Sequence, residues 1–166
     1  AANGANRTGR MFTGDASGDF LYAALHRTGY ANQPESVAAG DGLRLTGIRI
    51  VATVRCAPPE NKPTALEKAT CLPWLRRDLE LTPGLRTILT LGGIGWAGAL
   101  AAAAELGWRV PRPRPKFAHG TTVLLERPGA SPVRMVGCYH VSPHNTFTGR
   151  LTPAMLDEVL LSLRER

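Results

Sequence analysis

The chain has 166 residues, of which 43% are hydrophobic and 20% charged, a composition typical of one globular domain. No apolar run reaches the ~20 residues that a transmembrane helix needs. Lysine and arginine exceed aspartate and glutamate by 20 to 13, and the resulting net charge of +7 favours a polyanionic partner, although many basic proteins bind none.

The predicted elements alternate helices with strands. We expect a first helix that begins within residues 14–18 and ends at Gly29, followed by a strand over 43–55. A helix over 64–79 follows, with Leu66, Ala69 and Trp74 on one side. The remaining elements are a strand over 85–91, a helix over 94–106, strands over 121–126 and 133–139 around a Pro-Gly turn, and a helix over 153–163.

This alternation predicts a parallel sheet with helices on both faces. Ligands of such sheets bind beyond the carboxyl ends of the strands. In this chain those ends are expected at residues 56–62, 91–95 and 140–145.

The stretch 139–150, Tyr-His-Val-Ser-Pro-His-Asn-Thr-Phe-Thr-Gly-Arg, is the most informative in the chain. An apolar run ends at His140 and is followed by a loop of hydrogen-bonding residues. A strand that delivers one imidazole to a polar loop is a common way to place a catalytic group. The segment predicts a site at His140.

A second motif is the glycine-rich loop 7–19, which leads into the first helix. Such loops present backbone N–H groups and a helix N-terminus to an anion, although no P-loop Gly-Lys-Ser/Thr follows here. Asp15 is either a helix N-cap or a reactive carboxylate, and Phe12 is either a packing residue or a stacking surface.

The cysteines do not form a zinc-binding pattern, because Cys56 and Cys71 lack CxxC spacing. The pair fits either buried thiols or two ligands of an iron–sulfur cluster, which takes four thiolates. Cys138 lies within an apolar strand and is expected in the core. The cysteines of this chain alone do not complete a cluster.

Basic residues alternate with prolines in the segment 109–116, which predicts a stiff, extended stretch. Its cations fit either a nucleic-acid contact or a solvated linker. His119 follows directly and is a candidate for contact with DNA.

Three blocks together resemble the uracil-DNA glycosylase superfamily, in its family 5 (B-type) branch. They are Asn-Arg-Thr-Gly-Arg-Met-Phe-Thr-Gly-Asp-Ala-Ser-Gly at 6–18, Arg-Cys-Ala-Pro-Pro-Glu-Asn-Lys-Pro-Thr at 55–64, and the block at 139–152 that begins Tyr-His-Val-Ser-Pro-His. They occur in the family's order and span nearly the whole chain.

The resemblance implies a three-layer αβα sandwich around a four-stranded parallel sheet, formed by a single domain over residues 1–166. It also implies a [4Fe–4S] cluster with Cys56 and Cys71 as ligands. The family's Gly-Leu-Ala-Pro motif and its two N-terminal cysteines are not in this sequence. We therefore expect the first sheet strand and the other two cluster ligands upstream of Ala1.

The resemblance further implies a DNA glycosylase that flips uracil, and other deaminated bases such as hypoxanthine or ethenocytosine, out of the duplex. The catalytic residues are expected to be Asp15, Asn61 and His140. Phe12 and Gly14 would bind the base. Asp15, with Asp19 in reserve, would stabilise the sugar cation, His140 would donate to uracil O2, and Asn61 would recognise the base edge.

DNA contacts are expected from the residues around these motifs: Arg7, Arg10, His119, Ser142, His144, Asn145, Thr146, Thr148 and Arg150. His144 or Phe147 is expected to wedge into the gap left by the flipped base. His144 is equally consistent with an exposed loop histidine.

Family-4 relatives carry an asparagine where this chain has Ala52, which favours a wider substrate range. The alternatives are a narrow uracil-specific enzyme, a non-catalytic iron–sulfur module that binds damaged DNA, and a redox-sensing iron–sulfur protein. A cytoplasmic, nucleoid-associated monomer without a membrane segment is expected.

Overall fold

The structure is a computed structural model that describes residues 3–164, with the backbone alone for Asn3 and Asn61. Two compact units make up the chain. The first comprises residues 1–52, 56–61 and 140–166, and the second comprises residues 53–55 and 62–139. The expectation of a single domain stays a prediction.

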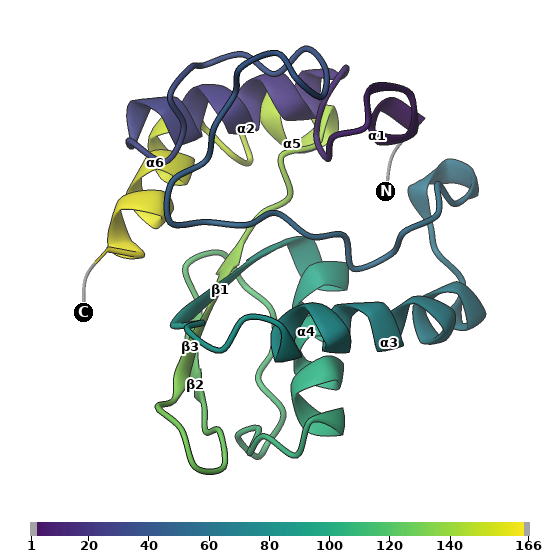
Figure 1. The fold of residues 1–166 in the computed structure, drawn as a ribbon, viewed down its shortest axis with the longest axis vertical. Coiled ribbons are helices and arrows are strands. Elements are labelled where there is room, and N and C mark those ends of the chain that lie inside the picture. Colours follow the sequence, from purple (N-terminus) through teal and green to yellow (C-terminus); the bar gives the residue numbers. More distant parts are fainter. Residues whose placement is uncertain (1–2, 165–166) are drawn as a thin grey trace. The chain divides into compact units, whose positions relative to one another are not determined.

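In the first unit, α2 (Ala16–Arg27) and α6 (Pro153–Ser162) pack against each other, as Figure 1 shows. Their facing surfaces supply the core of this unit. The buried side chains are Leu21, Tyr22, Ala24 and Leu25 from α2 and Leu156, Val159 and Leu160 from α6. Both helices match the predicted ranges closely.

Three short helical segments complete the first unit. They are α1 (Asn3–Thr8), the 3₁₀ turn η1 (Pro59–Asn61) and α5 (Pro143–Phe147). Their brevity explains why hydrophobic periodicity predicts none of them.

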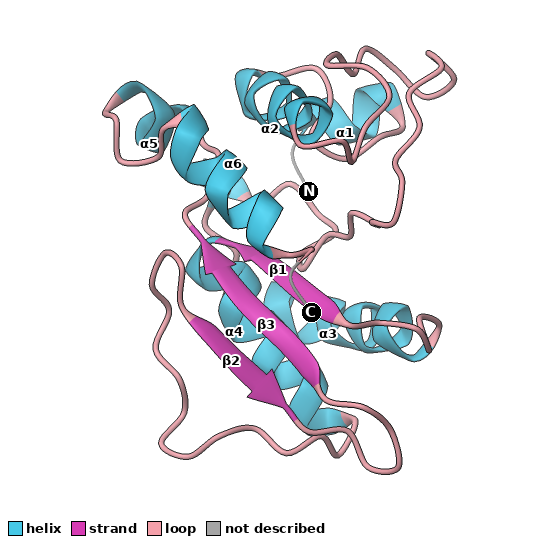
Figure 2. Cartoon of the chain, turned by 90° about the vertical axis from the view of Figure 1, so that its left-hand side faces the viewer, coloured by secondary structure: helices cyan, strands magenta, loops and turns pink. Residues whose placement is uncertain are grey.

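The second unit is a small sheet with helices. Its elements are α3 (Ala65–Glu80), β1 (Thr87–Leu91), α4 (Gly92–Glu105), β2 (Thr122–Leu125) and β3 (Val133–Cys138). The strand order is β1-β3-β2, and Figure 2 shows α3 and α4 behind this sheet. Trp96, Leu100 and Met135 lie at the centre of its core.

The strands are not all parallel. β1 pairs with β3 in parallel, as predicted, whereas β2 pairs with β3 antiparallel. The connection over residues 126–132 is too short for the crossover that a parallel pair requires. Among the described residues the sheet has three strands, so the chain has a mixed α/β fold.

The strand predicted over 43–55 does not form. The segment makes one isolated bridge, between Leu45 and Ala31, and is otherwise irregular. Alternating apolar residues become a strand only where a neighbour offers a ladder of backbone partners. Among residues 3–164, no strand lies alongside to provide that ladder.

The face of α3 was also predicted wrongly. Leu66 and Trp74 are 76% and 57% exposed, and the buried side chains are Cys71, Leu75 and Asp78. Asp78 is tolerated there because Arg55 donates a hydrogen bond to its carboxylate at 2.9 Å. Which face of α3 is buried therefore depends on contacts with other segments, and the sequence of the helix alone does not show them.

Candidate active site

Asp15 lies at the start of α2 and caps it. The backbone N–H of Gly18 donates to Oδ1 of Asp15 at 2.9 Å, so the N-cap interpretation is confirmed. Within the part of the chain that the structure describes, Oδ2 of Asp15 makes no hydrogen bond. The cap uses one carboxylate oxygen and leaves the other available for a ligand.

Phe12 adopts an unusual backbone conformation, with φ at 52°. A non-glycine residue in this region is uncommon and held there by its surroundings. Its carbonyl oxygen lies against the first turn of α2 at Gly18, where a Cβ atom would be only 1.9 Å away. The sequence Gly-Asp-Ala-Ser-Gly thus lets the Phe12 backbone lie against the helix that Asp15 begins.

The ring of Phe12 lies close to the imidazole of His140, with ring centroids 5.9 Å apart and an interplanar angle of 42°. Burial lowers the pKa of His140, and the nearby Asp15 carboxylate partly offsets this effect. The imidazole is therefore neutral at pH 7 and able to donate a hydrogen bond. Its nitrogens make no hydrogen bond to the described residues, so both are available to a ligand.

The first unit thus brings together three of the predicted site residues, Phe12, Asp15 and His140. An aromatic surface, a carboxylate and a neutral imidazole form a site that can hold a planar ring and stabilise opposite charges on either side of a bond. Asp19, the reserve carboxylate, lines a different pocket with residues 34–37. The side chain of Asn61 lies outside the described structure.

Position 14 requires a glycine, because the φ of Gly14 is 87° and a Cβ would lie 2.9 Å from Nη2 of Arg7. Nη2 of Arg7 in turn donates to the Gly14 carbonyl at 3.2 Å. Arg7 therefore supports the motif loop while it remains exposed to solvent.

Two buried side chains, Val141 and Leu151, anchor the segment after His140 at both ends. Between them lies α5, with Ser142 at its N-cap position. The amide of Asn145 donates to the His140 carbonyl at 2.8 Å, and the hydroxyls of Thr146 and Thr148 bond back to carbonyls of this segment. The exposed residues are Pro143, His144, Phe147, Thr148, Gly149 and Arg150.

Arg10 makes hydrogen bonds to other side chains of the protein, whereas Arg7 is exposed. Its Nη1 atom donates to Oδ2 of Asp41 at 2.8 Å and to Oγ of Ser36 at 2.9 Å. The predicted DNA contact of Arg10 stays a prediction, and one of its guanidinium nitrogens has partners within the protein. Sequence analysis missed Asp41 and Ser36, because only the fold brings them to the motif.

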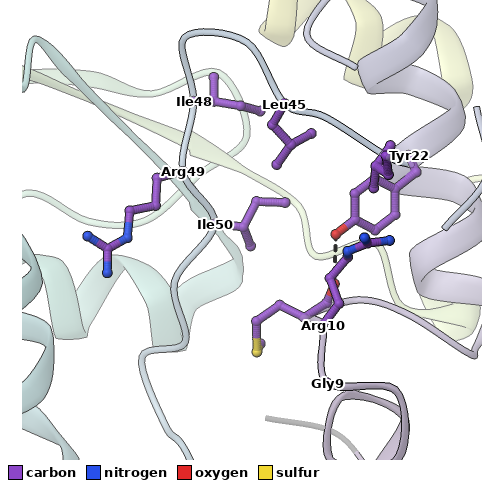
Figure 3. Close-up of a pocket in the computed structure, with 9 residues that line it drawn as sticks. Gly9, Arg10, Tyr22, Leu45, Ile48, Arg49 and Ile50 are labelled. Atoms are coloured by element: carbon purple, nitrogen blue, oxygen red, sulfur yellow. Dashed lines mark hydrogen bonds between the residues drawn. The ribbon is translucent and has the colours of Figure 1, made fainter. Parts of the chain in front are cut away.

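A pocket of about 420 Å³ lies beside Arg10 and Tyr22, as Figure 3 shows. Its other lining residues are Gly9, Met11, Leu43, Leu45, Ile48, Arg49 and Ile50. This lining is mostly apolar and contains none of Phe12, Asp15 and His140. The candidate site therefore lies outside this pocket, at the His140 side of the motif loop.

The predicted cluster ligands, Cys56 and Cys71, lie in different units. Cys56 is exposed and Cys71 is buried in α3, where its Sγ accepts a hydrogen bond from the backbone N–H of Arg55 at 3.3 Å. Cys138 is fully buried, which confirms it as a core residue, and this burial raises the pKa of its thiol to about 12.

Among the described residues, no group of three or more His, Cys, Asp or Glu side chains is arranged to hold a metal ion. Two cysteines supply half of the ligands that a [4Fe–4S] cluster requires. Cys56 and Cys71 by themselves are therefore too few to hold such a cluster.

His119 lies in the second unit and is half-buried. Its Nδ1 accepts the backbone N–H of Tyr139 at 3.2 Å, and the two rings stack with centroids 5.0 Å apart. These contacts brace the end of β3. The predicted DNA contact of His119 stays a prediction.

No helix of the described structure is both long and apolar enough to cross a bilayer. The fold and the site define a mixed α/β protein with a glycine-rich loop, a capping carboxylate and an imidazole at a strand end. The sequence pattern of the uracil DNA glycosylase superfamily matches residues 1–164.

Curated relatives refine this class. The chain is 56% identical to a type-5 uracil-DNA glycosylase of Mycobacterium bovis over 96% of this chain and 57% of the relative. It is 46% identical to one of Thermus thermophilus over 98% of this chain and 70% of the relative, and 42% identical to one of Pyrobaculum aerophilum over 96% and 65%.

The chain therefore belongs to the uracil-DNA glycosylase superfamily, with type-5 enzymes as its relatives. It spans about 57% of the length of the mycobacterial relative. The family interpretation of the three sequence blocks is confirmed.

Proposed function

We propose that this chain forms the base-excising site of a DNA glycosylase that removes uracil from DNA. The observation that carries the proposal is the grouping of Phe12, Asp15 and His140 within one unit, with the Phe12 and His140 rings 5.9 Å apart. The names of the relatives, type-5 uracil-DNA glycosylases, support the same substrate.

The residues suit the charges that develop when the glycosidic bond breaks. The electron pair of the C1′–N1 bond leaves with the base, so negative charge appears on uracil and positive charge on the sugar. His140, neutral at pH 7, donates a hydrogen bond to uracil O2 and stabilises the anion. Oδ2 of Asp15 faces the sugar cation and orients a water, whose oxygen bonds to C1′ and whose proton passes to the carboxylate.

Base recognition is assigned to residues around this pair. Phe12 stacks on the extruded ring and recovers part of the stacking lost from the duplex. Gly14 keeps the loop thin where the base approaches. Asn61 is proposed to recognise the N3–H and O4 edge of uracil with its amide, which both donates and accepts.

Contacts with the DNA are proposed for the segment after His140, together with Arg7, Arg10 and His119. Phosphates would be held by Asn145, Thr146, Thr148 and Arg150, and Ser142 would brace the DNA. Phe147 is 81% exposed, which suits an apolar wedge at the gap left by the base, with His144 beside it.

The test is uracil release from an oligonucleotide by the natively expressed protein under single-turnover conditions. Asp15→Asn and His140→Ala should each lower the rate by ~10²–10³ because each removes charge stabilisation from the transition state. DNA affinity, measured by fluorescence anisotropy, should change little.

The control is His26→Ala, since His26 is exposed on α2. No uracil release by the unsubstituted protein would overturn the proposed function. Equal losses of DNA binding in both site variants would instead make Asp15 and His140 structural residues.

We also propose a substrate range that includes hypoxanthine and ethenocytosine, on the basis of Ala52 and the family resemblance. A narrow uracil-specific enzyme is the alternative. Release of either base from a duplex separates the two, and activity on uracil alone would overturn the wider range.

The cofactor proposal is a [4Fe–4S] cluster to which this chain contributes Cys56 and Cys71, with two further thiolates from residues outside this sequence. The hydrogen bond from the Arg55 N–H to Cys71 Sγ suits a thiolate ligand. Iron content and intact mass of the purified protein test it: about four irons on a chain of 17.8 kDa would contradict the ligand count.

The finer fold proposal is an αβα sandwich with a four-stranded parallel sheet. The parallel β1–β3 pair and the alternating apolar pattern of residues 43–55 support it. A crystal structure of the natively expressed protein with 43–55 outside the sheet would overturn it.

We further propose a monomer that acts on DNA in the cytoplasm, at the nucleoid.

A further inference from the structure

The backbone on either side of Phe12 is held by side chains from other segments. Tyr22 of α2 donates its hydroxyl to the Met11 carbonyl at 2.8 Å, the bond drawn as a dashed line in Figure 3. Thr13 is buried, and its Oγ1 lies 2.6 Å from Oγ of Ser36. Phe12, with its φ of 52°, therefore lies between two fixed neighbours.

Asp41 organises the segment that supplies these partners. Its Oδ2 accepts from the backbone N–H groups of Val37 and Ala38, at 2.8 and 3.3 Å, and its Oδ1 accepts from that of Leu43 at 3.0 Å. The carboxylate thus fixes the loop around Ser36. The Arg10 guanidinium and these N–H groups hold the pKa of Asp41 well below its usual range, so the group stays charged.

Arg10 connects this loop to the motif. Its Nη1 donates both to Asp41 and to Ser36, and the side chains of Arg10 and Asp41 are only 20% and 13% exposed. The contacts form a chain from Asp41 through Arg10 and Ser36 to Thr13. Because Thr13 and Arg10 flank Met11 and Phe12, the chain of contacts closes around the strained residue.

We propose that Asp41 is a positioning residue for base excision, which acts through Arg10 and Ser36 to hold Phe12 in its left-handed conformation beside His140. The inference rests on the proposed function. Asp41 itself does not touch the base, and without it Phe12 relaxes away from the stacking position.

The experiment substitutes Asp41→Asn in the natively expressed protein. The amide keeps the size of the side chain but loses the charge that holds Arg10. We expect the single-turnover rate of uracil release to fall roughly 10-fold to 100-fold, because a misplaced positioning group costs up to about that factor. The dissociation constant for DNA should stay within about 2-fold.

A matched control is Asp157→Asn. Asp157 accepts two hydrogen bonds from Arg27, at 2.8 and 2.9 Å, in the same unit and away from the motif loop. Its loss removes an Arg–Asp pair that is bidentate and more exposed than the pair of Arg10 with Asp41. The rate of this variant should equal that of the unsubstituted protein.

A double-mutant cycle distinguishes positioning from general support of the fold. In a Phe12→Ala background, Asp41→Asn should cause almost no further loss of rate, because the residue on which it acts is gone. Fully additive losses would overturn the proposal. If Asp41→Asn does not fold at the assay temperature, Ser36→Ala takes its place in the same cycle, because it removes the hydrogen bond between Ser36 and Thr13.

The two proposals fail in different ways. An unsubstituted protein that releases no uracil overturns the proposed function and this inference with it. An active protein in which Asp41→Asn behaves like Asp157→Asn overturns this inference alone.

Discussion

At the residue scale, His140 shows how position alters chemistry. Burial lowers its pKa, and the Asp15 carboxylate opposes this effect. The lowered pKa keeps the imidazole uncharged around pH 7. In this state it can donate a hydrogen bond to an anion. Sequence analysis predicted the residue, but only the fold shows its burial and its neighbour.

The pKa of His140 provides a direct test. In the unsubstituted protein we expect NMR titration of the imidazole to give a pKa below the usual value of about 6.5. Asp15→Asn removes a charge that raises the pKa, so the pKa should fall further. An unchanged or higher pKa of His140 in that variant would contradict the interaction between the two groups.

Arg7 and Arg10 lie only three positions apart, yet the structure separates them. Arg7 is exposed, whereas Arg10 contacts Asp41, which is 31 positions away in the sequence. Local patterning predicted the same role for both. A long-range ion pair has no local signal, so the distinction could not be predicted.

At the element scale, the start of α2 depends on Gly18. Although alanine favours helices, a Cβ at this position would lie 1.9 Å from the Phe12 carbonyl oxygen, a backbone atom that cannot yield cheaply. We expect Gly18→Ala to lower the free energy of unfolding by about 1–3 kcal/mol, measured by urea denaturation.

Gly84→Ala is the control for this substitution, because no atom lies within 4 Å of its added Cβ. We expect its effect to stay within about 0.5 kcal/mol. Equal urea midpoints for the two variants would mean that the Phe12 carbonyl does not approach α2 as the structure has it.

The helix α3 begins with a capping box. Oγ1 of Thr64 accepts the Glu67 N–H at 3.1 Å, and the Glu67 carboxylate accepts the Thr64 N–H at 2.7 Å. Thr64→Ala should reduce the free energy of unfolding by about 1 kcal/mol, since the cap satisfies otherwise unpaired N–H groups. Denaturant unfolding measures the loss, and no loss would mean that water caps the helix equally well.

Helices were predicted far better than the strand over 43–55. The helices α2, α3, α4 and α6 satisfy their backbone groups within their own segments, so local sequence determines them. A strand requires a partner, and β2 and β3 have one through their short connection. The segment 43–55 has no such neighbour among residues 3–164, and its pattern alone does not make a strand.

At the scale of the whole molecule, the net charge of +7 predicts salt-dependent DNA binding. Arg112 and Lys116 are exposed in the proline-rich segment. If they contact phosphates, substitution of both by alanine should reduce the slope of log K against log salt by about 0.9 for each lost contact.

Affinities measured over a range of salt concentrations give this slope. The control is Arg77→Ala, because Arg77 donates to Glu80 at 3.2 Å and its charge is partly compensated. Identical slopes for all three proteins would identify the proline-rich segment as a solvated linker.

The sequence by itself determined the family and the four longer helices, α2, α3, α4 and α6, and it supplied the residues proposed for the site. Its motifs are contiguous, and helices and caps depend on neighbours a few positions away. The tertiary structure decided what depends on contacts between distant segments. These are the buried face of α3, the antiparallel β2, the burial of His140 beside Asp15, and the pairing of Arg10 with Asp41 that fixes the loop around Phe12.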